Sequence, residues 1–129
     1  MTIALQPKIV ATQVSAPQRD LLLLFVAFHP SEQEVTQLQH CLAELPAQIG
    51  YALVVNDHHP GEPVERLQAS ADCVLFNRDN PGYGRAVNRL VRRLTHLPTF
   101  LGVLNTDLSW PVGCFDSLLS WLRQHPDVS

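Results

Sequence analysis

Four short, almost wholly apolar segments alternate with stretches of helical periodicity, and this alternation is what most restricts the fold. The segments are "LLLLFVAF" (21–28), "YALVVN" (51–56), "CVLFN" (73–77) and "TFLGVLN" (99–105). A strand without polar alternation is buried on both faces, which is typical of a parallel sheet enclosed by helices. The pattern therefore predicts an α/β fold: a Rossmann-like, mostly parallel sheet with helices on both faces.

Helical patterns fill the intervals between these strands. Ser31 stands three residues before Glu34, a capping box for a helix that Pro46 ends. A short helix is expected over 64–69, and Pro111 suits the first turn of a final helix. The residues expected to face the core from the three longer helices are Val35, Leu38, Cys41, Leu42 and Leu45; Ala86, Val87, Leu90, Val91 and Leu94; and Phe115, Leu118, Leu119 and Leu122.

The length of the chain suits one domain. With 129 residues it is long enough for a real core and too short for two large domains. Residues 1–19 lack periodicity and contain Pro7 and Pro17, so we expect an N-terminal extension there. Residues 20–129 are then the domain proper.

Charge and cysteine content restrict the partners and the cellular compartment that we expect. The net charge is −3 with no Lys/Arg run, which disfavours a nucleic-acid partner. The longest apolar run, 21–28, is too short to span a membrane, and the N-terminus lacks a signal-peptide pattern. Three widely separated cysteines (Cys41, Cys73 and Cys114) suit buried thiols in a reducing compartment. We therefore expect a cytoplasmic protein without a transmembrane segment.

Polar residues follow each predicted strand. The four segments are "AFHP", "VNDHH", "FNRDNPGYG" and "LNTDLSW". In parallel α/β sheets, ligands bind at the carboxyl ends of the strands, near the point where the strand order reverses. The sequence therefore predicts a binding site formed by these four strand ends.

These four strand ends resemble a known family. A strand ending in an aromatic residue, a strand ending in an acid and an amide, "NPGYGRAVN", and a strand ending in "NTD" occur in that order over 21–129. This is similar to the nucleotide-binding half of family 2 glycosyltransferases of the GT-A fold, in particular the rhamnosyltransferase-like branch. The pairing of "NPGYGRAVN" with "LNTD" is more specific than either stretch alone.

The resemblance implies an inverting, hexosyltransferase-like enzyme of polysaccharide biosynthesis. Such an enzyme would transfer a sugar from a UDP- or dTDP-sugar to the hydroxyl of a sugar or lipid-linked acceptor. A divalent metal, Mg²⁺ or Mn²⁺, would neutralise the diphosphate leaving group. Peripheral association with the inner face of the membrane would fit a lipid-linked acceptor.

The resemblance also implies roles for individual residues. Asn80, Gly82 and Tyr83 would lie against the base and ribose, with Gly82 allowing close approach. Asn88 would brace this loop from the helix by hydrogen bonds. The plainer interpretation of the stretch is a helix N-terminus with turn residues and one polar core Asn.

The "NTD" stretch takes the place of the family's D-x-D. Asn105 would hydrogen-bond the ribose and Asp107 would bind the metal, because one carboxylate plus phosphate oxygens can suffice for Mg²⁺ or Mn²⁺. The plainer interpretation is a strand end whose Asp caps the next segment. Trp110 and Pro111 are expected to be structural.

Two strand ends depart from the family pattern. Asn56 and Asp57 exchange the usual acid and amide, so either Asn56 accepts a hydrogen bond from the base or Asp57 turns in to do so. Phe28 and His29 would stack on the base and donate to it, or else be a core residue and a solvated turn residue. His58 and His59 are interpreted as loop residues, because adjacent side chains rarely converge on one ion.

No catalytic residue is identified. Inverting enzymes use a carboxylate general base, which in this family lies in the second half of a longer chain. Asp116 and Asp127 fall on or after the final helix and receive no role. We therefore expect the donor-binding part of a longer enzyme, with little or no sugar transfer on its own. An open sheet edge would favour a homodimer.

Other classes remain to be compared. A non-catalytic interaction module with a GT-A-like fold is the main alternative, favoured by the exchanged Asn56–Asp57 and the absent base. A receiver- or flavodoxin-like domain is disfavoured, because a receiver needs an acidic pair directly after its first strand. A dinucleotide-binding domain is disfavoured, because no G-x-G-x-x-G follows that strand.

Overall fold

The computed structural model describes residues 10–11 and 18–126. The strands are β1 (Val10–Ala11), β2 (Leu21–Phe28), β3 (Ile49–Asn56), β4 (Cys73–Phe76) and β5 (Phe100–Asn105). The helices are α1 (Glu32–Ala43), the 3-10 helix η1 (Pro63–Leu67), α2 (Tyr83–Val91) and α3 (Cys114–Gln124).

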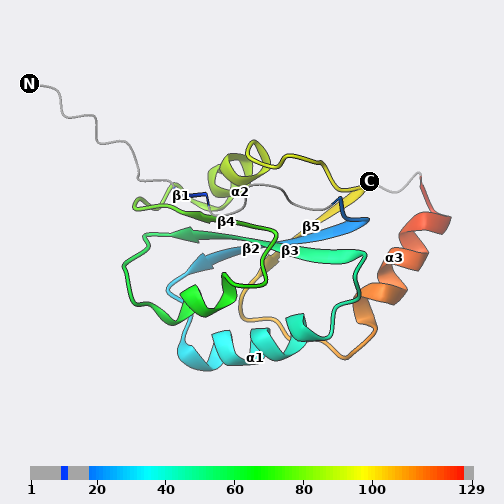
Figure 1. The fold of residues 1–129 in the computed structure, drawn as a ribbon, viewed down its shortest axis with the longest axis horizontal. Helices are drawn as coiled ribbons and strands as arrows, with labels where there is room; N and C mark the ends of the chain where they lie inside the picture. The colour runs from blue at the N-terminus through cyan, green and yellow to red at the C-terminus, as the bar shows by residue number, and fades with distance from the viewer. Residues whose placement is uncertain (1–9, 12–17, 127–129) are drawn as a thin grey trace, which may run out of the picture.

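The strands form one sheet in the order β1-β4-β3-β2-β5. The pairs β2–β3, β3–β4 and β2–β5 are parallel, and the pair β1–β4 is antiparallel. In Figure 1, α2 lies above the sheet, while α1 and η1 lie below it and α3 lies at one end. The predicted Rossmann-like, mostly parallel sheet with helices on both faces is confirmed.

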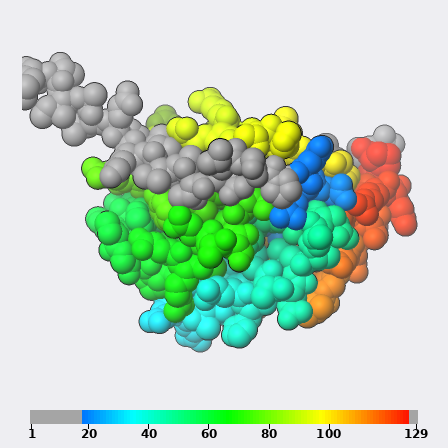
Figure 2. All heavy atoms as spheres, viewed as in Figure 1, coloured from blue at the N-terminus to red at the C-terminus, as the bar shows by residue number. Residues whose placement is uncertain are grey.

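Alternate residues of the strands supply two separate cores. On one face, Leu21, Leu23 and Phe25 of β2 pack with residues of α1, η1 and α3. On the other face, Leu22 and Leu24 pack against α2. Because both faces are covered, β2 and β3 have no need of polar alternation, which explains their continuous apolar sequence. Figure 2 shows α1 and the segment around η1 packed together along one side of the molecule.

The sequence misplaced parts of two helices. The final helix begins at Cys114 rather than near Pro111, because Gly113 has a left-handed backbone (φ 85°) that interrupts any helix before it. Leu118, expected to face the core, is 41% exposed, while Leu119 is buried. The helix predicted over 64–69 is the 3-10 helix η1, Pro63–Leu67.

An ion pair between Arg19 and Asp72 fixes the start of the domain against the segment before β4. Arg19 donates two hydrogen bonds to the buried Asp72, from Nε to Oδ2 at 2.8 Å and from Nη2 to Oδ1 at 2.9 Å. Within the predicted extension, Val10 and Ala11 pair with β4. The remainder of that extension, 1–9 and 12–17, lies outside the described residues.

Strand β5 is the other edge of the sheet and is less covered than its neighbours. Leu101 and Val103 pair with Leu22 and Leu24, so they face the side of the sheet that carries α2. Both side chains are exposed. Within the part of the chain that the structure describes, β5 hydrogen-bonds to β2 alone.

The three cysteines differ in their surroundings. Cys73 is buried and Cys41 is half-buried, but Cys114 is exposed at the start of α3, so the expectation of three buried thiols is wrong for Cys114. All three are free thiols. None of the helices between residues 18 and 126 is long and apolar enough to cross a membrane.

Candidate functional site

The strand order places a switch point between β2 and β5. The chain moves outward from β2 to β3 and β4, and then returns to add β5 on the opposite side of β2. Because these strands are parallel, their carboxyl ends lie at one edge of the sheet, toward the left of Figure 1 for β2 and β3. The register pairs Phe28 with Asn56 and Val26 with Asn105. All four predicted segments therefore open on the same edge.

Phe28 and His29 both face outward at the end of β2. Phe28 is 56% exposed and so is not a core residue. The His29 ring lies between two carboxylates, with Nε2 at 2.8 Å from Oδ2 of Asp57 and Nδ1 at 2.7 Å from Oε2 of Glu62. His29 is therefore not the simple solvated turn residue of the plainer interpretation.

These contacts shift the ionisation of all three groups. The hydrogen bonds to Glu62 and then to Asp57 raise the pKa of His29 above its ordinary value. The hydrogen bond from His29 lowers the pKa of Asp57. The pKa of Glu62 is lowered although burial acts in the opposite direction, because the His59 backbone N–H and His29 both donate to its carboxylate. The cluster therefore favours a charged His29 between two ionised acids.

Asn56 faces the interior and its amide is already engaged. It is 3% exposed, and its Oδ1 accepts a hydrogen bond from Nδ2 of Asn77 at 3.1 Å. Its Nδ2 donates to the Gly82 carbonyl at 3.5 Å. Asn77 is also buried, and its Oδ1 has no partner among the described residues. Of the two residues at the end of β3, Asp57 is therefore the one whose side chain is accessible.

The loop after β4 is fixed by backbone and side-chain bonds. The Asp57 N–H donates to the Asp79 carbonyl at 2.8 Å, and the His58 N–H donates to the Asn77 carbonyl at 2.9 Å. Arg89 holds the Asp79 carboxylate from α2 at 2.8 and 2.9 Å. These contacts bring the "NRDNPGYG" loop against the end of β3.

Gly82 is required by its backbone conformation. Its φ of 89° and ψ of 179° lie in a region that essentially only glycine adopts. A Cβ at this position would meet no described atom within 4 Å. The space beside Gly82 is therefore open to a ligand.

The other predicted residues of this loop are exposed. Asn80 and Tyr83 lie at the surface, and Tyr83 is 47% exposed at the first position of α2. Asn88 is exposed and makes no side-chain hydrogen bond to any residue of the described chain, so its bracing of the loop stays a prediction. Arg89, the next residue, holds the loop through Asp79.

Asn105 and Asp107 lie at and after the end of β5. Both are exposed, while Thr106 between them is buried. Asp107 forms no ion pair within residues 18–126. An exposed carboxylate without a cationic partner suits a hard divalent ion that keeps waters and takes further oxygens from a phosphate. Trp110 stacks on Phe25 of the core, in agreement with the structural role expected for it.

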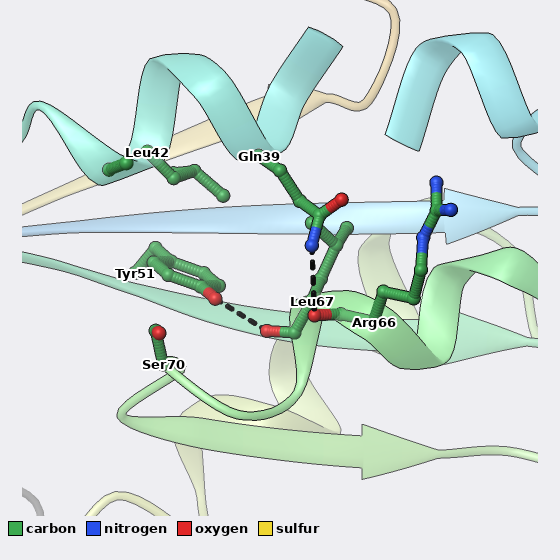
Figure 3. A pocket seen from close by; sticks show the side chains of 7 residues that line it. Gln39, Leu42, Tyr51, Arg66, Leu67 and Ser70 are labelled. Atoms are coloured by element: carbon green, nitrogen blue, oxygen red, sulfur yellow. Dashed lines mark hydrogen bonds between the residues drawn. The ribbon is translucent and has the colours of Figure 1, made fainter. Parts of the chain in front are cut away.

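A hollow that the sequence does not predict lies between α1, η1 and the start of β3. Its volume is about 210 Å³, and Gln39, Tyr51, Arg66 and Ser70 contribute polar groups to it. In Figure 3 the Tyr51 hydroxyl points to the Leu67 carbonyl and the Gln39 amide points to the Arg66 carbonyl. Tyr51 is near the start of β3, so this hollow lies away from the carboxyl ends of the strands.

Sequence reasoning missed four members of the site. No motif in the sequence points to Glu62, Asn77, Asp79 or Arg89, and the pattern around His59 indicates only a loop position. A weaker signal for Glu62 is the run "DHHPGE", in which acids flank two histidines. A weaker signal for Asp79 and Arg89 is an acid in a loop followed by a basic residue on the next helix.

Comparison with known proteins does not assign a family. No protein-family model matches the chain, and no curated protein matches it either.

Proposed function

We propose that this chain is the donor-binding domain of a family 2-like glycosyltransferase. It binds a UDP- or dTDP-sugar together with Mg²⁺ or Mn²⁺, and the full enzyme transfers the sugar with inversion to a sugar or lipid-linked acceptor. The setting is cytoplasmic, with peripheral association at the inner face of the membrane. No residue of this chain is assigned as the general base.

One observation carries this proposal. The polar or aromatic segments at the ends of β2, β3, β4 and β5 share one edge of a parallel sheet at a strand-order switch point. Such an edge is where α/β folds bind their ligands. The loop with Gly82 and Tyr83 is held toward this edge by the Arg89–Asp79 pair and by Asn56. An exposed Phe28 is available to stack on a base.

The residues near β5 fit the metal that this function implies. Asp107 offers one free carboxylate, a hard oxygen donor, while Asn105 stays available to hydrogen-bond the ribose. When bound, the ion would offset the negative charge of the diphosphate. The chain itself supplies the stacking surface at Phe28, the turn at Gly82 and the carboxylate at Asp107.

Calorimetric titration with UDP and dTDP, with and without Mn²⁺, tests the proposal. We expect nucleotide binding that depends on Mn²⁺ and that Asp107→Ala weakens by at least tenfold. Asp116→Ala, which removes an exposed acid on α3, should bind as the unaltered chain does. No nucleotide binding, or binding indifferent to both Mn²⁺ and Asp107→Ala, would reject the proposal.

A non-catalytic interaction module is the second candidate. The open edge of β5, with Leu101 and Val103 exposed beside it, favours this function and also a homodimer. Sedimentation at tens of micromolar distinguishes the two candidates when combined with the titration. A stable dimer that Val103→Lys dissociates, with no nucleotide binding, would favour the interaction module. A clean monomer that binds nucleotide would exclude it.

A further inference from the structure

We propose that His29, Asp57 and His59 form a binding site for one divalent transition-metal ion of the Zn²⁺ class. These residues come from the loops after β2 and β3. The inference does not rest on the proposed glycosyltransferase function, because it needs neither nucleotide nor Asp107. It concerns a second, chemically different ion from the Mg²⁺ or Mn²⁺ considered above.

The ligand atoms are already close together. One nitrogen of each histidine and one carboxylate oxygen of Asp57 all lie within 4.8 Å of one another. His29 Nε2 is 2.8 Å from Asp57 Oδ2, and His59 Nε2 is 3.7 Å from Asp57 Oδ1. Ligand atoms around a tetrahedral Zn²⁺ lie roughly 3.3–3.5 Å apart, given bonds of about 2.0–2.1 Å. Small side-chain rotations are therefore enough to admit the ion.

Glu62 orients the His29 ring and holds the backbone at His59. Its Oε2 lies 2.7 Å from Nδ1 of His29, which leaves Nε2 facing the Asp57 carboxylate. A metal-binding histidine usually donates its other ring N–H to a carboxylate in this way, which fixes the tautomer and the ring orientation. Glu62 Oε1 also accepts a hydrogen bond from the His59 backbone N–H at 2.6 Å. One carboxylate thus holds both histidine-bearing loops.

The backbone at two of the ligands is unusual. His29 and Asp57 both have left-handed conformations, with φ values of 47° and 50°. Few non-glycine residues adopt this region, and such conformations collect at functional sites. The His29 and His59 rings lie nearly parallel, with centroids 5.8 Å apart and planes 13° apart. The two ring nitrogens nearest Asp57 are the Nε2 atoms of these histidines, and a rotation of the His59 ring would turn both toward one ion.

The donor set selects the class of metal. Two imidazole nitrogens and one carboxylate oxygen suit Zn²⁺ and its first-row neighbours, whereas Mg²⁺ prefers oxygen ligands alone. Three protein ligands leave a further coordination position, and the exposure of His29 and His59 opens it to solvent. A bound water or an added ligand would fill that position.

Protons compete with the metal at this site. Without metal, His29 donates to Asp57 and Glu62 together only when both of its ring nitrogens carry protons. The groups that face it are these two carboxylates and the His59 ring. A bound metal ion would take the place of the proton that lies between His29 Nε2 and the Asp57 carboxylate.

Calorimetric titration of tag-free protein with ZnCl₂ tests the site, with Co²⁺ absorption as a report on geometry. We expect one ion per chain. His29→Asn, Asp57→Asn and His59→Ala should each weaken binding by at least tenfold, and Glu62→Gln by about 10- to 100-fold. Asn is chosen at positions 29 and 57 because it tolerates the left-handed backbone. His96→Ala, which removes an exposed histidine of another loop, should leave affinity unchanged.

Several results would overturn the inference. Absence of Zn²⁺ binding, or a His59→Ala affinity equal to that of His96→Ala, would exclude the site. A thiolate band in the Co²⁺ spectrum that Cys114→Ser removes would place the ion at the exposed cysteine instead. Thermal melts of each variant confirm folding, so lost binding can be assigned to lost ligands. Because nucleotide is absent throughout, failure here leaves the donor-binding proposal unaffected.

Discussion

Arg89 and Asp79 form a two-pronged ion pair that joins α2 to the loop after β4. Nη1 of Arg89 lies 2.8 Å from Oδ1 of Asp79, and Nη2 lies 2.9 Å from Oδ2. Asp79 also accepts the Asp57 backbone N–H through its carbonyl. The pair therefore connects a helix, a glycine-containing loop and the end of β3.

Replacing this arginine by lysine should weaken the connection although charge is preserved. Arg89→Lys cannot make two parallel bonds to one carboxylate, so we expect a loss of about 1 kcal/mol in the free energy of unfolding. Urea denaturation measures the change. Arg92→Lys, at an exposed position of the same helix end, should cost less than half as much. Equal effects of the two substitutions would show that the paired geometry is unimportant.

The His29 cluster should make stability depend on pH. The folded-state pKa of His29 is raised above its ordinary 6.5, so its contribution is fully present below pH 6.5 and is lost as pH rises through the folded value. The lowered pKa of Asp57 keeps this carboxylate ionised in the same range. Melting temperatures of the metal-free chain should therefore exceed those of His29→Asn most near pH 6, and the difference should shrink by pH 9. A difference that grows with pH would contradict this.

Two glycines should respond in opposite directions to alanine. At Gly50 a Cβ would lie 2.2 Å from Asp72 Oδ2 and 2.7 Å from Arg19 Nε, so Gly50→Ala must displace the Arg19–Asp72 pair. We expect a loss of about 2–3 kcal/mol. At Gly84, in α2, a Cβ meets no described atom within 4 Å, and Gly84→Ala should gain about 0.5–1 kcal/mol. Denaturant unfolding of both variants checks the opposite signs.

Tyr51 should contribute through its hydroxyl. The hydroxyl of this buried side chain donates a hydrogen bond to the Leu67 carbonyl. Tyr51→Phe leaves that carbonyl unpaired and should lower the free energy of unfolding by about 1–2 kcal/mol. Burial is the main reason that the pKa of Tyr51 rises to about 12. Because the folded pKa is raised, stability should fall as pH rises from 10 toward 12.

A second tyrosine serves as the control for this prediction. Tyr83→Phe removes an exposed hydroxyl on α2 and should change the free energy of unfolding little. Denaturation at pH 7 and at pH 11 compares the two variants. If Tyr51→Phe and Tyr83→Phe behave alike at both pH values, the buried hydrogen bond contributes nothing measurable.

The sheet could be predicted from the sequence because its strands are apolar on both sides. An apolar strand such as 21–28 can bury both of its faces only between two layers of helices, so its composition predicts that environment. The two helix corrections have different causes. Gly113 delays the start of α3. Phe115 and Leu119, one turn apart, face the core, while Leu118 lies at the margin of that face and is exposed. How much of that face the neighbouring elements cover is a tertiary property that periodicity does not predict.

The contacts within the candidate site could be predicted only in part. Strand-end positions follow from the parallel sheet, but partner choice among loop side chains does not. His29 pairs with Glu62, which follows a different strand, and no spacing rule links two loops of independent length. Adjacent histidines rarely converge on one ion, so the pair His58–His59 predicts only loop residues, and in the structure His58 does contact Glu65 instead. The actual companion of His59 is His29, which only the folded arrangement brings near.

The return of the chain to the far side of β2 has a consequence for folding order. Leu21 pairs both with Ile49, nearby in sequence, and with Phe100, far along the chain. Closing the longer loop costs more chain entropy, so β2 with β3 and β4 should assemble first and β5 should dock late. Until docking, one side of the central strand stays open to other chains. Concentration at the moment of refolding, more than final stability, should therefore decide the yield of native protein.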